Sequence, residues 1–577
     1  MKKPVKLGKN RSENRQFVVL FRHFLLRMFH NDVLKFEDQR RENFIILLSF
    51  FIAAGSVLSV FILMPYLIAM LGYTSETVWV EKTLFITLSM AFTGIISVIN
   101  WNNLYLDEKD YLHLTGLPVS TGALFTAKFF SLLAFVGIIS LAIHVGPVLI
   151  FTFFLGEIYN VNPFYHTSIV SFALVHLVTS FMANLFVFLV VALIQGIVLL
   201  LPGTRGFKKI SMAVQTLLLM GFVSIFIWFP HTASTLEKLK EQYHSFIYYF
   251  PPLWFVGFYE QMIGNYDMVF KKHLYIAPAV VVLLMNVYAF SIPLCFKRYS
   301  SPYSAGKVES AFSRMLAALK RSFDHIFLGN SLQKAIFYFS LSVLNRSRKH
   351  KLHLAVFITL PVTFVMTHAW IKLYRGGWAY FTGYQPLLIA IPLLLYFFVV
   401  LGFRVVVSYP AAVDANWIFQ LTVKENPTPY IKGLKKVILL FGILPIFAVL
   451  LAFYSFCWGV IPALLHSVFS VTLAWVILEL FFVHYRKIPF VSAYIPGKAG
   501  LKYFWGLYLL GFALYMWGFS ALGMILLRNP IFYFIYYLLL ADALYLLRRY
   551  RLKRENANPV VFDEEPEPAM LGFGLDP

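Results

Sequence analysis

The sequence predicts an all-α polytopic membrane protein with about twelve transmembrane helices in two repeated six-helix halves. Composition is the first reason: 59% of the 577 residues are hydrophobic and 13% are charged, against roughly 25% charged residues in soluble domains. The second is the recurrence of apolar runs of 18 or more residues, the length that a bilayer core of about 30 Å requires of a helix. The third is that Lys and Arg gather beside alternate runs, as the positive-inside rule describes.

The apolar runs place six spans in each half of the chain. The first set covers 44–71, 83–100, 129–155, 168–200, 210–229 and 273–296. The second set covers 352–372, 384–408, 437–457, 460–484, 504–526 and 530–548. With the N-terminus inside, the inner segments hold most of the 49 Lys and Arg residues. The chain is therefore expected in the bacterial inner (plasma) membrane, with both termini cytoplasmic.

Two pairs of short segments indicate an internal repeat. Asp110 to Lys128, DYLHLTGLPVSTGALFTAK, aligns with Trp417 to Lys435, WIFQLTVKENPTPYIKGLK, at an offset of 307 that places Lys128 on Lys435. PGTRGFKK, starting at Pro202, likewise echoes PGKAGLKY, starting at Pro496, at an offset of 294. Self-similarity of this kind identifies a repeated architecture.

Five regions follow from the spans and the charge pattern. They are a basic cytoplasmic segment (1–42), the first six-span half (43–297), a cytoplasmic connector (298–350), the second six-span half (351–549) and a cytoplasmic tail (550–577). The first segment and the connector each contain an amphipathic stretch, which is typical of a helix lying in the membrane surface. These stretches are Phe17 to Phe29 and SLQKAIFYFSLSVLNRSRKHK, Ser331 to Lys351. The tail combines acidic residues with prolines and is predicted to be disordered.

The outer side is predicted to differ between the halves. Tyr243 to Gly264 is rich in aromatic residues and has Pro251-Pro252 at a bend. It is expected to form a helix that packs as a lid on the outer membrane surface, where aromatic residues are favoured. The corresponding connection in the second half is only Arg528-Asn529-Pro530.

No sequence motif predicts catalysis in this chain. A phosphate-binding GxxxxGK[ST] loop is missing, as are HExxH, GxSxG and cysteine pairs at metal-binding spacing. We therefore expect no catalytic residue, no cofactor and no metal site. The charge of +22 lies beside the spans, so membrane lipids rather than nucleic acid are the expected contacts.

Three ionisable residues inside or at the ends of spans are candidate functional groups, as such residues are by default. Glu479 and Asp542 each precede a basic inner flank by six or seven residues, and Arg404 near the inner end of the eighth span is a possible partner. They could couple transport to ions, or they could form a structural ion pair, which we favour. His144 and His176, in the third and fourth spans, are expected to be hydrogen-bonded core residues.

The pattern D-x-L-x-L-x-x-L-P-V-S-x-x-x-L-x-x-A-K at residues 110 to 128 resembles the loop after the second span of ABC-2-type transporter permeases. In that family an interfacial helix precedes six spans, outer re-entrant helices precede the sixth, and the inner loop forms a coupling helix. The coupling helix docks on a separate ATP-binding subunit, which would hold the ATP. The second half departs from the pattern, because VKENPTP replaces LPVS and the outer helices are missing.

The resemblance implies two docking elements on the inner face. The residues concerned are Tyr111, Leu114, Leu117 and Pro118 in the first half, and Trp417, Phe419 and Leu421 in the second. A helix ended by Pro118 and followed by a capping Ser or Thr would form a rigid knob. Lys128 and Lys435 would then anchor the next spans at the headgroup level.

Three functions are consistent with these features. The first is the permease of an ABC exporter whose ATPase is another polypeptide. The second is an ion-coupled secondary transporter, since two repeated halves also suit that class. The third is a membrane-embedded lipid-processing enzyme or an assembly scaffold.

Overall fold

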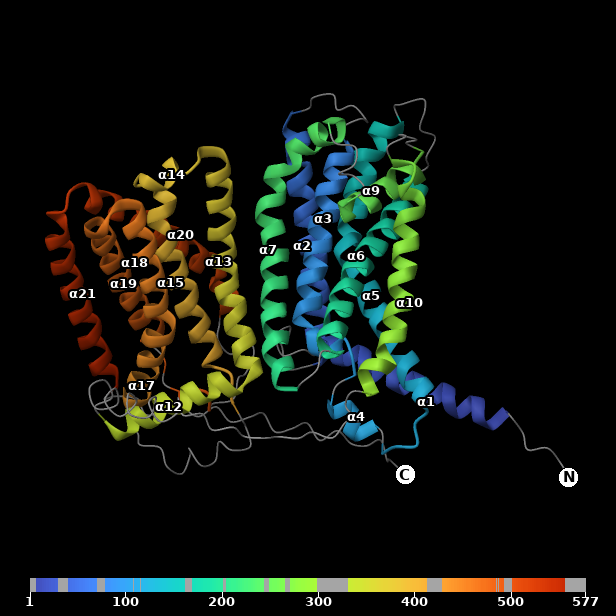
Figure 1. Ribbon diagram of the computed structural model, residues 1–577, viewed down its shortest axis with the longest axis horizontal. Helices are drawn as coiled ribbons and strands as arrows, with labels where there is room; N and C mark the ends of the chain where they lie inside the picture. Colours follow the sequence, from blue (N-terminus) through green and yellow to red (C-terminus); the bar gives the residue numbers. More distant parts are fainter. Residues whose placement is uncertain are drawn as a thin grey trace. The chain divides into compact units, whose positions relative to one another are not determined.

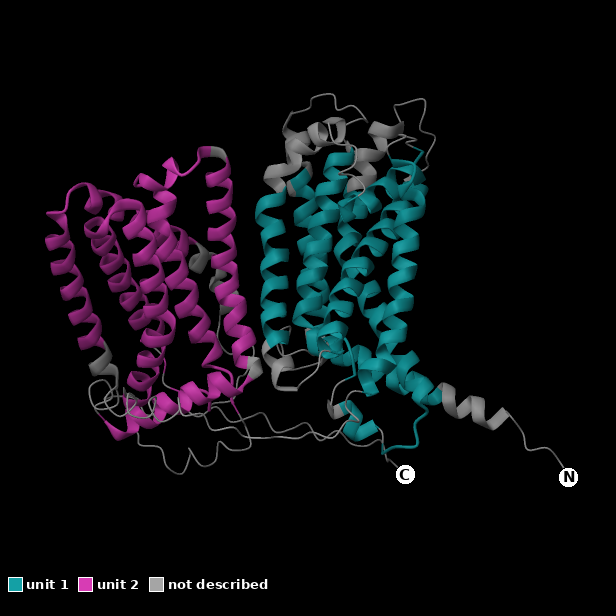
Figure 2. Cartoon of the chain, in the orientation of Figure 1, with its two compact units in different colours: residues 1–304 teal, residues 305–577 magenta. Residues whose placement is uncertain are grey.

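The computed structural model is all-α, as predicted. It describes residues 7–29, 40–69, 78–106, 108–114, 116–160, 169–200, 204–242, 249–264, 270–297, 330–411, 428–483, 485, 487–491 and 501–555. Every regular element among these residues is helical. The chain divides into two compact units, Met1–Ser304 and Ala305–Pro577 (Figure 2).

Unit 1 contains the helices α1 (Leu7–Phe29), α2 (Arg40–Ala69), α3 (Val78–Ile99), η1 (Trp101–Asn103), α4 (Glu108–Leu114), α5 (Thr121–Asn160), α6 (Ile169–Leu200), α7 (Thr204–Gln242), α9 (Pro251–Met262) and α10 (His273–Lys297). Unit 2 contains α12 (Ser331–Arg346), α13 (Arg348–Gly376), α14 (Ala379–Thr382), α15 (Pro386–Val406), α17 (Thr428–Ile438), the π-helical η5 (Leu439–Ile443), α18 (Leu444–Trp458), α19 (Val460–Phe482), α20 (Leu501–Arg528) and α21 (Phe532–Glu555).

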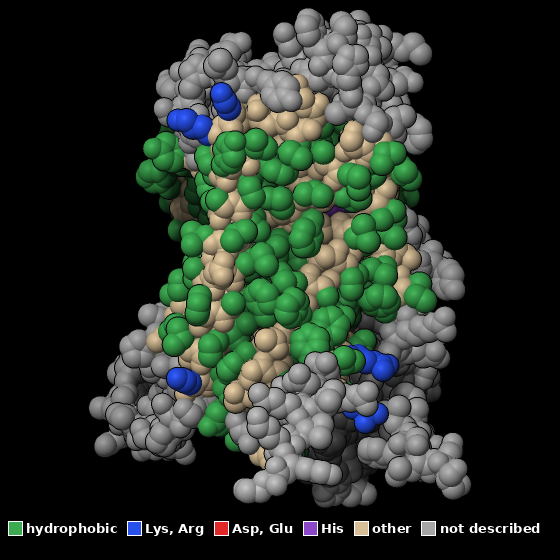
Figure 3. Space-filling model, turned by 90° about the vertical axis from the view of Figure 1, so that its right-hand side faces the viewer, with side chains coloured by type: hydrophobic (Ala, Val, Ile, Leu, Met, Phe, Trp, Pro, Cys, Tyr) green, Lys and Arg blue, Asp and Glu red, His purple; other side chains and the backbone are tan. Residues whose placement is uncertain are grey.

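Ten of the described helices are long and apolar enough to cross a membrane. Each overlaps a predicted span. The two further predicted spans fall on α2, whose apolar stretch Phe44–Val60 is shorter, and on α21. A polytopic membrane protein is therefore confirmed, and the number twelve stays a prediction. Figure 3 shows hydrophobic side chains covering the middle of one face, with Lys and Arg toward both ends.

Four pairs of helices pack together in both units, whereas α2 packs mainly on α5 and the helix at its place in unit 2, α13, packs mainly on α15. In unit 1, α1 packs on α5, α3 on α7, α3 on α6, and α5 on α6. In unit 2, the helices at the matching places in the chain do the same: α12 packs on α17, α15 on α20, α15 on α19, and α18 on α19. This correspondence agrees with the repeat that the two sequence alignments indicate.

The first predicted amphipathic stretch is the second half of α1, and the second stretch forms α12 and continues into the start of α13. Figure 1 shows α1 and α12 each lying crosswise at the end of its own bundle. The Asn330 side chain caps α12 by accepting a hydrogen bond from the Leu332 N–H. The Ser347 side chain then caps α13, so the crosswise helix and the first span of unit 2 meet at a single residue.

The inner loop of unit 1 contains the short helix α4, which lies at the same end of the unit as α1 (Figure 1). The chain turns through Leu117 and Pro118, and α5 begins at Thr121. The Ser120 hydroxyl accepts a hydrogen bond of 3.2 Å from the Ala123 N–H, which is the predicted cap of the following helix.

The predicted segment Tyr243 to Gly264 is helical over α9, its residues 243–248 lie outside the described residues, and α9 is buried against neighbouring helices rather than exposed. α9 begins with Pro251-Pro252 in its first turn, where proline is favoured. It packs against α3, α6 and α10, and eight of its twelve residues are buried. At Gly257 an added Cβ would lie 2.6 Å from the His273 Cβ, so a glycine is required for this close approach. The aromatic residues of α9 thus serve burial inside the bundle.

Candidate functional site

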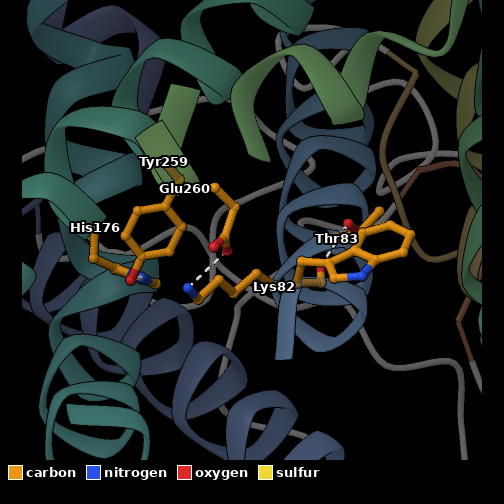
Figure 4. Close-up of polar contacts among 6 residues, drawn as sticks. Lys82, Thr83, His176, Tyr259 and Glu260 are labelled. Carbon is orange, nitrogen blue, oxygen red and sulfur yellow. Dashed lines mark hydrogen bonds and ion pairs between the residues drawn. The ribbon is translucent and has the colours of Figure 1, made fainter. Parts of the chain in front are cut away.

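A buried ion pair connects α9 to α3 near one end of unit 1. The Lys82 Nζ lies 2.8 Å from the Glu260 Oε1, and the two side chains are 1% and 0% exposed (Figure 4). A charge so far from water is stable only when it is paired and hydrogen-bonded. The pair therefore fixes the position of α9 relative to α3.

Two aromatic rings also face the Lys82 ammonium. Its Nζ lies 4.5 Å from the centroid of the Tyr259 ring and 5.5 Å from that of Phe172. Both distances are within the range of cation–π attraction, which is stronger where water is excluded. Glu260 and Tyr259 are consecutive residues of α9, whereas Phe172 comes from the start of α6. Two helices, α9 and α6, thus supply the carboxylate and the two rings around a cation that belongs to a third helix, α3.

Behind Tyr259, two buried histidines continue the polar contacts into the unit. The Tyr259 Oη lies 3.3 Å from the His176 Nδ1, and the His176 Nε2 lies 3.2 Å from the His144 Nδ1. The expectation that both histidines are hydrogen-bonded core residues is confirmed. Burial raises the pKa of the Tyr259 phenol well above its ordinary value, and the Glu260 carboxylate raises it further. The phenol therefore keeps its proton and can donate it to His176.

The chain of hydrogen bonds ends on Ser89, Asn184 and Ser140. The His144 Nε2 lies 2.8 Å from the Ser89 Oγ, the Ser89 hydroxyl donates to the Asn184 Oδ1 over 3.1 Å, and the Asn184 Nδ2 donates to the Ser140 Oγ over 3.0 Å.

One assignment of protons follows from the Ser89 hydroxyl. Since it donates to Asn184, the Nε2–H of His144 must donate to Ser89, and the Nδ1 of His144 then accepts from His176. In turn the Nδ1 of His176 accepts from Tyr259. This assignment leaves only the longer contact of 3.3 Å between Asn184 and His144 as a contact of two donors. In this assignment each imidazole carries one proton, and the network holds Tyr259 in one orientation.

The inner loop of unit 1 is fastened to two neighbouring helices. The Arg27 Nη1 of α1 lies 2.7 Å from the Asp110 Oδ1 of α4. Gln16, also of α1, donates its amide to the Pro118 carbonyl over 3.1 Å and accepts from the Ser120 N–H over 3.3 Å. The Tyr111 ring packs on Phe296 of α10, with 5.2 Å between centroids.

The predicted docking residues of the first half therefore differ in their placement. The Tyr111 ring contacts its own unit, Leu114 is half-buried, and Leu117 and Pro118 are exposed. Leu112 belongs to the sequence pattern but is not one of the predicted docking residues; it is 66% exposed, and Leu117 is 54% exposed. The predicted docking residues of the second half, Trp417, Phe419 and Leu421, lie outside the described residues.

The three predicted intramembrane residues are not brought together. Glu479 pairs with Lys435, at 2.6 Å between the Oε2 and the Nζ. Arg404 donates to the Phe481 carbonyl and to Ser408, and it lies over the Tyr485 ring, so it is not the partner of Glu479. Asp542 is exposed on α21. The structural ion pair exists, but with a different cation.

Lys128 and Lys435 also differ from the expectation that they reach the headgroups. Both are buried, at 1% and 4% exposure. Lys128 donates to the Asn103 carbonyl over 2.6 Å and lies over the Phe24 ring. The residues aligned by the repeat thus occupy equivalent buried positions, and each is paired inside its own unit.

Sequence reasoning missed Lys82 and Glu260. Lys82 lies one residue before the predicted second span, 83–100. Glu260 lies in the segment that was expected at the outer membrane surface. The one available signal was their charge. Glu260 is a charged residue within an aromatic segment, and Lys82 is a charged residue directly before an apolar run. Within the part of the chain that the structure describes, no group of three or more His, Cys, Asp or Glu could hold a metal ion.

Comparisons with protein-family models, curated proteins and solved structures give no match. The resemblance to ABC-2-type permeases therefore depends on the sequence pattern alone, above all at residues 110 to 128.

Proposed function

We propose that the chain is the membrane-spanning permease of an ATP-driven ABC exporter. The energy comes from a separate ATP-binding subunit, which docks on the inner loops and holds the ATP. α4 and the turn that follows it are the docking element of unit 1.

The observation that carries this proposal is the way in which α4 combines fixed and exposed residues. Asp110 is tied to Arg27 and the turn at Pro118 is tied to Gln16, so the loop is held against α1. Leu112 and Leu117 are exposed on the same short segment. Exposed apolar side chains on a rigid support are the usual anchors of a protein interface.

This support also connects the loop to the spans. α1 packs along α5, and Tyr111 contacts α10 through Phe296. A force applied to α4 would therefore reach α5 and α10 without being lost in a flexible loop. Such a connection is what a permease needs if closure of an ATPase dimer is to tilt its helices.

The ion-coupled alternative loses its original support. It required Glu479 and Asp542 to act as exchangeable carboxylates. Glu479 is paired with Lys435 inside unit 2, and Asp542 is exposed on α21.

The proposal is tested by co-purification of an ATP-binding subunit with the full chain. Loss of a buried interface anchor weakens binding by about 2 kcal/mol or more, which is roughly a thirtyfold change in the dissociation constant. Leu112→Asp and Leu117→Asp together should reduce co-purification by at least this factor, and Leu114→Asp should reduce it less, because Leu114 is half-buried.

The matched control is Met262→Asp, which adds the same charge at an apolar residue that is 48% exposed at the end of α9, outside the docking element. It should leave co-purification unchanged. Leu421→Asp is the corresponding change in the second half, and it should also reduce co-purification of the ATP-binding subunit. Equal recovery of an ATP-binding subunit with the wild type and with the double variant would contradict the proposal.

A further inference from the structure

The groups around the Lys82 ammonium are those that bind organic cations. The Tyr259 and Phe172 rings face it at 4.5 and 5.5 Å, and the Glu260 carboxylate supplies the opposite charge at 2.8 Å. Aromatic faces beside an anion, shielded from water, are the arrangement by which proteins recognise quaternary and primary ammonium ligands. Here the cation belongs to the chain itself. We call Phe172, Tyr259 and Glu260 the cage.

The two aromatic walls of the cage have contacts besides those with Lys82. The Tyr259 Oη contacts His176, which contacts His144, so the orientation of the ring is fixed from behind. The Tyr259 and Phe172 rings also contact each other, with 5.7 Å between centroids. Lys82, by contrast, carries its ammonium on a flexible four-carbon stem. Displacing the Lys82 side chain would leave these contacts of the two rings in place.

The cage lies close to the ends of its helices. Lys82 is the fifth residue of α3 and Phe172 is the fourth residue of α6. At a rise of about 1.5 Å per residue, both lie within roughly 6 Å of the first residue of their helix. Glu81, one residue nearer to that end, also attracts the Lys82 ammonium. Lys82 can thus leave the cage toward the end of the helix and still have a carboxylate close by.

We propose that the cage is a binding site for an organic ammonium group, and that Lys82 fills it as an internal substitute when no ligand is bound. The ligand class is a small alkylammonium or quaternary ammonium compound, or a larger molecule that presents such a group. Binding is a property of unit 1 alone. Identifying the bound cation as the cargo rests on the function proposed above.

The test measures binding of tetramethylammonium to the purified full chain by isothermal titration calorimetry, in a non-ionic detergent. Lys82→Gln removes the internal cation and keeps a donor for Glu260. A tethered group competes at an effective concentration in the millimolar range or above, so this variant should bind at least about tenfold more tightly than the wild type. Neopentyl alcohol, which has a similar shape and no charge, should not bind.

Two further variants locate the site. On the Lys82→Gln background, Tyr259→Leu and Glu260→Gln should each abolish the gain. Tyr485→Leu is the matched control, because Tyr485 lies under a different cation, Arg404, at 4.6 Å in unit 2. It should leave binding unchanged.

A measurement on the wild type keeps the proposal testable should these variants fail to fold. Saturating tetramethylammonium should expel Lys82 and make it reactive toward a water-soluble acetylating reagent, with the modified residue identified by mass spectrometry. The proposal is overturned by a folded Lys82→Gln protein that does not bind the probe, or by Lys82 reactivity that the probe leaves unchanged. Neither result depends on an ATPase, so failure here and failure of the exporter proposal are separate outcomes.

Discussion

Removing the carboxylate of the buried ion pair should destabilise unit 1 strongly. In Glu260→Leu the Lys82 ammonium loses its partner at a site where both side chains are at most 1% exposed. Breaking such a pair by deleting one partner typically costs 3 to 5 kcal/mol. Because the pair is shielded from solvent, water does not weaken its attraction, and the full range of about 3 to 5 kcal/mol applies. Because Glu81 offers the released ammonium another carboxylate, we expect a loss near the lower end, about 3 kcal/mol.

The double variant Lys82→Met with Glu260→Leu separates this explanation from simple loss of packing. Replacing a whole buried pair by apolar side chains of similar volume is often neutral or even stabilising. The double variant should therefore unfold at or above the midpoint of the wild type when unfolding is followed by tryptophan fluorescence during titration with SDS. The reasoning would be refuted by a single variant as stable as the wild type, or by a double variant at least as unstable as the single one.

Two other predictions concern the close approach of α9 and the topology. Gly257→Ala should lower the free energy of unfolding by about 1 to 3 kcal/mol, because the added Cβ would collide with His273. Gly221→Ala is the control and should not destabilise, because nothing lies within 4 Å of an added Cβ there. Equal losses for the two variants in the same SDS titration would contradict the proposed packing. Single cysteines replacing Ser234 and Ser310 should react with a membrane-impermeant maleimide from outside and from inside, respectively. Labelling of both from the same side would exclude the predicted topology.

Helices and their ends were predictable because their causes are local. Long apolar runs require helices in a bilayer, and Ser120 caps α5 through a residue only three positions away. The amphipathic pattern that predicts α1 and α12 is also contained within each segment. The connection between α20 and α21 is short, as expected, since α21 begins four residues after Arg528.

The candidate site was not predictable because its parts come from distant segments. Lys82 and Glu260 are 178 residues apart, and no local pattern links them. The composition of α9 suits a membrane surface and a bundle interior equally well, so its aromatic residues gave no information about its depth. Lys128 and Lys435 have apolar stems that suit the headgroup region. Their burial depends on acceptors, the Asn103 carbonyl and Glu479, that only the folded units supply.

The central claim, that a separate ATP-binding subunit docks on α4, is tested most directly by photo-crosslinking in the native cell. p-Benzoylphenylalanine is placed at Leu117, which is exposed beyond α4, and for comparison at Leu174, which is exposed on the membrane span α6. The account predicts that an ABC ATP-binding protein, identified by mass spectrometry, is crosslinked from position 117 and not from position 174. Absence of any ATP-binding protein among the products from position 117 would contradict it.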